Sequence, residues 1–259
     1  MRPVSTPVTR KIITHLSAAD PVMRALIAAV GPYRLRADAT APPFQILARA
    51  IAHQQLNGTA ANTILGRFIE RCGAGGFPLP AVVLACEEPL LRACGFSFAK
   101  IASLKDLAHK TESGVVPARE ALLELENEAI IERLTQVRGI GRWTVEMMLM
   151  FHLRRPDVLP VDDFGVRNGF RLAYGLRALP APRVLARYGE CWAPHRTAAA
   201  WYLWRAVELH KAGKLPPPPK GFRLPRVPRR HRKAVNTPSR RPRRAGPRRP
   251  RPSRSRSPR

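Results

Sequence analysis

Two carboxylates near the middle of the chain are of a type and spacing that could carry chemistry. They close the segment Pro160-Val161-Asp162-Asp163, and apolar residues at helical spacing follow directly after them. This pattern predicts that both aspartates lie at or near the start of a helix. A carboxylate fixed there can stabilise positive charge that develops on a bound substrate. Aspartate is also a favoured helix N-cap, so a structural role explains either residue taken alone.

A glycine turn upstream of the aspartates could hold an anion. Residues 131–151 have the pattern of two helices joined by Gly139-Ile140-Gly141. Two glycines one residue apart permit a tight turn with positive φ, and they leave backbone N–H groups bare ahead of the next helix. Those donors and the positive helix end suit a phosphate, and Arg142 adds a charge beside them. The alternative is an ordinary turn between helices.

Helical periodicity dominates the elements that must position these residues. Apolar residues recur at i, i+3, i+4 and i+7 in several segments, whereas convincing strand alternation is missing. Glycine and proline separate the segments, for example at Gly31-Pro32, Pro42-Pro43 and Gly95. The sequence therefore predicts an all-α fold of two packed helical subdomains.

Charge divides the 259 residues into a body and a tail. The chain has 45 Lys and Arg against 18 Asp and Glu, a net charge of +27. Residues 215–259 hold 17 of these cations, 12 of the 27 prolines and no acid, so residues 1–214 carry +10. We expect a folded body over 1–214 and a disordered basic tail over 215–259. The tail either binds nucleic acid through salt-sensitive counterion release or is a solubilising extension.

Composition excludes several classes of protein. No run of ~18 apolar residues could span a membrane, and no apolar stretch follows Met1-Arg2-Pro3 to suggest secretion. The four cysteines are too few and too scattered for a disulfide scaffold, and they form no Cys-x-x-Cys pair, which argues against structural zinc and an iron–sulfur loop. We expect a reduced cytoplasmic protein, associated with the nucleoid, whose partner is a nucleic acid.

Together, the glycine turn, Trp143 and the Val-Asp-Asp segment resemble the helix-hairpin-helix DNA glycosylase superfamily. Within it, the chain is most similar to the 3-methyladenine DNA glycosylase II group. The resemblance covers roughly residues 12–212, and the hairpin and aspartate segments are its most specific parts. Larger members carry an additional N-terminal β-domain, for which this chain has no room, so the compact all-helical form is implied.

The resemblance implies a role for each motif residue. Asp163 would be the catalytic carboxylate, and Gly139, Gly141, Arg142 and Thr144 would bind the DNA backbone. The remaining candidates are Gln55 and Leu56 as a wedge that enters the duplex, Trp143, Phe164 and Trp204 as the lining of the base pocket, and Lys100 as a further backbone contact.

The implied activity is removal of an alkylated purine by a monofunctional DNA glycosylase. Such an enzyme flips the nucleotide out of the duplex and hydrolyses the N-glycosidic bond. Trp143 stands where members with lyase activity place a lysine, and an indole cannot form a Schiff base. Because an alkylated purine leaves as a neutral base, one carboxylate can suffice, and Asp162 is assigned to helix capping.

The expected partner is double-stranded DNA with damaged bases, bound by a monomer. No cofactor or metal is expected, although backbone carbonyls of residues 137–141 could ligate a monovalent cation. Two alternatives remain open. One is a helix-hairpin-helix DNA-binding protein without enzymatic activity, and the other is a glycosylase for oxidised or mismatched bases.

Overall fold

The computed structural model describes residues 7–36, 38 and 40–219, and all of its helices belong to one compact unit, residues 1–225. These residues form helices and no β-strand, which confirms the all-α prediction. The helices are α1 (Pro7–Ala19), α2 (Pro21–Val30), α3 (Pro43–His53), α4 (Gly58–Cys72), α5 (Pro80–Ala85), α6 (Glu88–Cys94), α7 (Phe98–Glu112), α8 (Arg119–Leu123), α9 (Asn127–Leu134), α10 (Arg142–Phe151), α11 (Phe164–Ala173), α12 (Pro182–Tyr188), the 3-10 helix Gly189–Trp192 and α13 (Arg196–Lys211). The prediction of tail disorder falls, apart from residues 215–219, outside the described residues.

Side-chain caps and prolines determine where many of these helices begin. The Asn57 side chain caps α4 by accepting from the amide of Ala60 at 2.9 Å. The Ser97 hydroxyl caps α7 by accepting from the amide of Lys100 at 3.3 Å. Proline stands in the first turn of α2, α3, α5 and α12, where its missing N–H costs no hydrogen bond.

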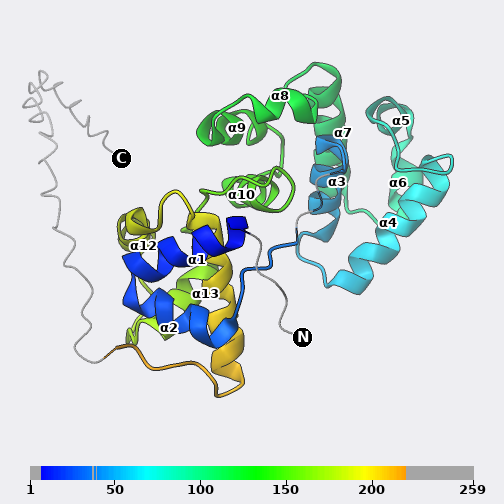
Figure 1. The fold of residues 1–259 in the computed structure, drawn as a ribbon. Helices are drawn as coiled ribbons and strands as arrows, with labels where there is room; N and C mark the ends of the chain where they lie inside the picture. Colours follow the sequence, from blue (N-terminus) through cyan, green and yellow to red (C-terminus); the bar gives the residue numbers. More distant parts are fainter. Residues whose placement is uncertain (1–6, 37, 39, 220–259) are drawn as a thin grey trace, which may run out of the picture. The chain divides into compact units, whose positions relative to one another are not determined.

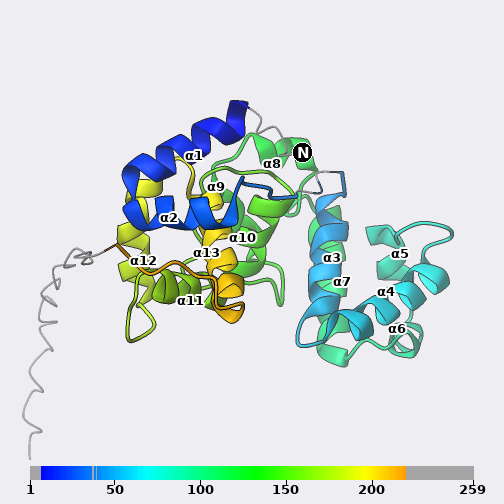
Figure 2. The same cartoon turned by 60° about the horizontal axis from the view of Figure 1, so that its bottom comes forward.

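The helices pack in two groups (Figure 1). Helices α1, α2, α11, α12 and α13 contact one another, and α3 packs against α4, α7 and α10 in the second group. Helices α3 and α7 lie side by side in both views (Figure 2). This arrangement has the two packed groups of helices that the sequence predicts.

A buried carboxylate fastens the N-terminal helices to the C-terminal ones. Asp20 is fully buried and caps α2 through its Oδ1 atom. Its Oδ2 atom accepts from Trp192 Nε1 at 2.9 Å, from the Tyr188 hydroxyl at 3.2 Å and from the Tyr174 hydroxyl. These donors replace the hydration that a buried carboxylate loses. The beginning of the chain is thereby held against the segment that contains α11 and the 3-10 helix.

The predicted helical hairpin is present as α9 and α10, joined by residues 135–141. Its first helix begins at Asn127, before the predicted start at 131. Ile130 and Leu134 of α9 and Val145 and Leu149 of α10 are fully buried, which packs the two helices together and leaves the turn at one end. The glycine turn is therefore held at the surface by a buried apolar seam.

Candidate active site

Asp163 is the N-cap of α11. Its Oδ1 atom accepts from the amide of Val166 at 2.7 Å, which fixes the carboxylate at the positive end of the helix. The capping role assigned to Asp162 is therefore wrong. Asp162 is exposed and precedes the cap, so the predicted catalytic residue is also the capping residue.

Two tryptophans, one before and one after Asp163 in the chain, donate hydrogen bonds to its carboxylate. Trp143, in the first turn of α10, donates its Nε1–H to Oδ2 at 2.8 Å. Trp204, on α13, donates its Nε1–H to Oδ1 at 2.9 Å. Hydrogen bonds to an ionised carboxylate are roughly twice as strong as neutral ones. Three donors thus set the direction in which the carboxylate points.

Two glycines of α11 let Trp204 approach the carboxylate. A Cβ atom on Gly165 would lie 2.8 Å from Cδ1 of Trp204, and one on Gly169 would lie 1.9 Å from the carbonyl oxygen of Leu203. Helices α11 and α13 can therefore cross closely only because these positions lack side chains. The Phe151 ring stacks on Trp204 with centroids 5.9 Å apart, which orients the indole further.

A cavity of about 710 Å³ opens beside Trp143, between α3, the turn after it, the hairpin turn and α10. Its apolar surface comes from Trp143, Met147 and Phe151, at i, i+4 and i+8 on α10, and from Met148 and Ile46. Arg49, His53 and His152 add polar groups to the lining. A purine-sized ligand fits a cavity of this size and composition.

The predicted pocket residues are only partly brought together. Trp143 lines the cavity and is 51% exposed. Phe164, 68% exposed, and Trp204 are outside the cavity lining, although Trp204 contacts Asp163. Met147 and Phe151 were not predicted as pocket residues. Their spacing from Trp143 is visible in the sequence, but an apolar helical stripe is typical of a core.

The hairpin turn presents bare amides. Gly139 has a φ of +77°, in the left-handed region, whereas Gly141 is extended with a φ of −97°. Only the first glycine thus needs its predicted positive φ. The amides of Gly139, Gly141 and Arg142 have no acceptor among the described residues. The half-buried Thr144 lies in the first turn of α10 and lines the cavity. This geometry suits a phosphate at the start of α10.

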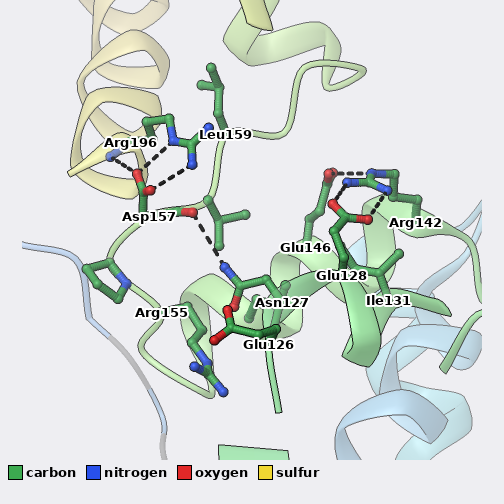
Figure 3. Close-up of a pocket in the computed structure, with 13 residues that line it drawn as sticks. Glu126, Asn127, Glu128, Ile131, Arg142, Glu146, Arg155, Asp157, Leu159 and Arg196 are labelled. Carbon is green, nitrogen blue, oxygen red and sulfur yellow. Dashed lines mark hydrogen bonds and ion pairs between the residues drawn. The ribbon is translucent and has the colours of Figure 1, made fainter. Parts of the chain in front are cut away.

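The Arg142 side chain is paired with two carboxylates of the hairpin, and its predicted contact with the DNA backbone stays a prediction. Its guanidinium donates to Glu128 of α9 through both terminal nitrogens and to Oε1 of Glu146 at 3.0 Å (Figure 3). These carboxylates raise the pKa of Arg142 and compensate its charge. Burial raises the pKa of Glu146 to about 7. Arg142 therefore ties the two hairpin helices together and faces a second cavity of about 480 Å³.

The wedge candidates stand in the turn between α3 and α4. Gln55 has a φ of +58° and is exposed, and Leu56 is 40% exposed. Neither side chain is part of the core, so both are placed where a duplex could meet them. The neighbouring Gln54, which was not predicted, donates its Nε2–H to the carbonyl of Gly139 at 2.7 Å. Lys100 donates to the carbonyl of Ala52 at 2.7 Å, and its contact with the DNA backbone stays a prediction.

The backbone carbonyls of the hairpin turn are the groups that would ligate a monovalent cation. Those of Val137, Gly139 and Gly141 each accept a hydrogen bond within the protein. A carbonyl oxygen has a second lone pair, so ligation of a cation by residues 137–141 stays a prediction. In the described part of the chain, His, Cys, Asp and Glu side chains form no group of three or more that could hold a metal ion.

Comparisons with known proteins establish the family. Residues 48–194, more than half of the chain, match the model of the HhH-GPD superfamily base excision DNA repair proteins. The chain therefore belongs to this superfamily, as its resemblance implied. Both the hairpin and Asp163 lie within the matched residues.

Individual relatives show which members of the superfamily this chain is similar to. The chain is 46% identical to DNA-3-methyladenine glycosylase 1 of Schizosaccharomyces pombe over 75% of this chain and 86% of the relative. The structure of the 3-methyladenine DNA glycosylase of this yeast in complex with abasic DNA has a TM-score of 0.69, over 77% of this chain and 97% of that one. A DNA-3-methyladenine glycosidase structure from Bacillus halodurans has a TM-score of 0.73 at 33% identity, covering 82% of this chain and 95% of that one.

Among the described residues, the helices are too short or too polar to cross a membrane.

Proposed function

We propose that this protein is a monofunctional DNA glycosylase that removes alkylated purines of the 3-methyladenine type in base excision repair. The observation that carries this proposal is the Asp163 carboxylate, which accepts hydrogen bonds from Trp204 and from Trp143, a residue that lines a purine-sized cavity. The hairpin's bare amides and the exposed turn after α3 flank that cavity. The named relatives are 3-methyladenine glycosylases, which supports the same reaction.

The chemistry needs a single well-placed carboxylate. As the bond between C1′ and the base nitrogen breaks, its electron pair leaves with the base and positive charge develops on the deoxyribose. The Asp163 carboxylate stabilises this charge, orients the water that adds at C1′ and accepts the proton that this water releases. An N3- or N7-alkylated purine is already cationic and departs neutral, so no general acid and no cofactor is required.

The aromatic cavity favours the same class of base. The Trp143 ring is half exposed at its entrance, and the Phe151 ring lies further along α10. Cation–π attraction to a desolvated alkylpurine contributes ~0.5–2 kcal/mol. The reaction leaves the DNA strand uncut, since the indole of Trp143 cannot form the Schiff base that a lyase uses.

The substrate would be double-stranded DNA, and the protein would act where that DNA lies, including the nucleoid of a bacterial cell. Action as a monomer stays a prediction. Gln55 and Leu56 would fill the space left by the flipped nucleotide, and the amides of the hairpin would hold the strand at a phosphate.

The test is release of free base from methylated duplex DNA under single-turnover conditions. The Asp163→Asn variant keeps an oxygen to cap α11 but loses the charge, so we expect it to bind DNA and to release base at least about a hundredfold more slowly. Asp162→Asn, which removes the same charge one residue earlier, is the matched control. The assignment is wrong if Asp163→Asn keeps the wild-type rate or if both variants lose activity equally.

A further inference from the structure

Four polar side chains form a stripe along α7 that the proposed mechanism does not use. The polar stripe consists of Lys100, Ser103, Asp106 and Lys110. Their spacings of three and four residues place them on one face of the helix. Helix α7 runs beside α3 (Figure 2). This face contacts the last turn of α3, directly before one of the turns assigned to DNA, and the hairpin turn, which is the other.

One end of the polar stripe holds the last turn of α3, from which the wedge candidates follow. The Lys100 ammonium donates to the carbonyl of Ala52 at 2.7 Å, in the last turn of α3 and directly before Gln54 and Gln55. Burial lowers the pKa of Lys100. The carbonyls of a last helical turn lack partners within the helix, so this ammonium satisfies one of them and fixes where the turn begins.

The other end of the polar stripe holds the hairpin turn. Asp106 accepts from the amide of Arg138 at 2.7 Å, and Lys110 donates to the carbonyl of Gln136 at 2.6 Å. The two side chains also pair with each other at 2.7 Å. An acceptor and a donor from α7 thus fix the two peptide groups on either side of Val137.

The middle of the polar stripe brings the two turns together. A Cβ atom on Gly139 would lie 2.8 Å from Oγ of Ser103, so the glycine rests directly on α7. From the turn after α3, Gln54 reaches the carbonyl of Gly139 at 2.7 Å. The wedge turn (residues 54–57) therefore contacts the hairpin turn (residues 135–141). Helix α7 contacts the hairpin turn and the last turn of α3, from which the wedge turn leaves.

We propose that the polar stripe of α7 sets the spacing between the wedge turn and the hairpin turn, with Asp106 and Lys110 as positioning residues for duplex binding. The inference rests on the proposed function, because it concerns how two DNA-binding turns act together. Each of Lys100, Asp106 and Lys110 contacts a main-chain atom. These contacts fix the end of α3, where the chain enters the wedge turn, and the path of the hairpin turn. Phosphates along a duplex have a regular spacing. The hairpin turn, which would hold a phosphate, and the wedge turn, which would enter the duplex, must therefore stay at a distance that matches this spacing.

Two lysines of α7 provide a matched test. Lys105 also donates to main-chain carbonyls, those of Leu84 at 2.7 Å and Cys86 at 2.5 Å, but these lie at the end of α5 and away from both turns. Lys105→Met and Lys110→Met remove the same charge and the same type of contact. Affinity for a duplex with a tetrahydrofuran abasic-site analogue is measured by fluorescence anisotropy. We expect Lys110→Met to weaken binding about tenfold and Lys105→Met by less than about twofold.

Asp106 gives a second test with a counterintuitive sign. Removing an acid from a DNA-binding surface should tighten binding if only charge matters. We expect Asp106→Ala instead to weaken binding about tenfold, because the Arg138 amide and Lys110 lose their partner. Asp106→Asn keeps an acceptor for that amide and should recover most of the affinity. At saturating enzyme, all these variants should release base within about threefold of the wild-type rate.

Several outcomes overturn the inference. They are equal binding by the two lysine variants, tighter binding by Asp106→Ala, or no recovery by Asp106→Asn. Thermal unfolding of every variant separates a general loss of stability from a loss of positioning. We expect Lys105→Met and Lys110→Met to lose the same amount of stability. Binding to the abasic analogue needs no base release. If the wild-type protein fails to release methylated bases, the proposed function is refuted, while the binding comparison still tests the inference about α7.

Discussion

The indole nitrogen of Trp204 lies 2.9 Å from Oδ1 of Asp163, a residue 41 positions earlier in the chain. This contact joins the last helix of the fold to the start of α11, and Gly165 leaves the space that it needs. The direction of the carboxylate is therefore set by tertiary packing as well as by the helix cap.

The first prediction concerns this contact. Trp204→Phe keeps an aromatic ring against Phe151 but removes the N–H donor to Asp163. A hydrogen bond to a charged group contributes ~1.5 kcal/mol, so we expect base release to slow about tenfold. Single-turnover excision from methylated DNA measures the rate.

Trp201→Phe is the control for this prediction. Trp201 lies on the same helix and packs edge-on against Tyr33, with ring centroids 5.4 Å apart. Its substitution should leave the excision rate unchanged within about twofold. Equal rates for the two variants would mean that the Trp204 donor does not orient the carboxylate.

The second prediction concerns the crossing of α11 and α13. Gly169→Ala places a methyl group against the backbone of Leu203, which cannot yield as a side chain can. We expect a loss of unfolding free energy of about 2 kcal/mol or more, measured by urea denaturation. The control is Gly66→Ala, in α4, where a Cβ atom meets nothing within 4 Å. That variant should gain roughly 0.5–1 kcal/mol, and destabilisation by both would point to a different cause.

The third prediction concerns pH and Glu146. Burial raises its pKa from 4.5 to about 7, so the folded state binds this proton more tightly than the unfolded state does. The stabilisation of the folded state by protonated Glu146 is present in full below pH 4.5 and is lost as the pH rises toward 7. Over that range, Glu146 should lower the free energy of unfolding by an amount on the order of 3 kcal/mol.

Glu146→Gln tests this pH dependence. Its side-chain oxygen can still accept from Arg142, but it does not titrate. The difference in unfolding free energy between variant and wild type, measured in urea at several pH values, should therefore shift in favour of the variant as the pH rises. A difference that stays constant from acid to neutral pH would contradict the prediction.

The fourth prediction concerns the basic tail. Removing residues 220–259 deletes 17 cations but retains Pro218, next to Gly175. We expect the logarithm of the affinity for undamaged duplex to fall less steeply with the logarithm of salt concentration, because fewer counterions are released on binding. Base excision by the truncated protein should continue. An unchanged salt slope would identify the tail as a segment without a role in DNA binding.

Local patterns were enough to predict the helices, the hairpin and the segment that holds the carboxylate. Each of these depends on neighbours in the chain, such as apolar spacing, glycines and an aspartate before a helix. Assignment of the cap to Asp162 failed because adjacent aspartates satisfy the same pattern, and only the backbone path selects Asp163.

The contacts between distant elements could not be predicted in this way. Arg142 was assigned to phosphate because it adds a charge beside the glycine turn. Its spacing from Glu146 is visible in the sequence, but nothing there indicates that Glu128 of α9 also pairs with it. The partners of Gln54 and Asp106 are main-chain atoms, which any residue supplies, so their sequence positions give no signal. The polar stripe of α7 has visible helical spacing, but that spacing is equally typical of a solvated face.

The pairing of Arg142 with two glutamates has a consequence for the search along intact DNA. A strand that reaches the start of α10 meets peptide dipoles, while the Arg142 guanidinium beside them is already paired with Glu128 and Glu146. Peptide dipoles hold a phosphate only at short range and in the right orientation, unlike a free guanidinium, which attracts any nearby strand. At this point of the hairpin, contact with undamaged stretches would consequently be shorter than with a free guanidinium in its place. A flipped base would add the contacts in the aromatic cavity that prolong residence.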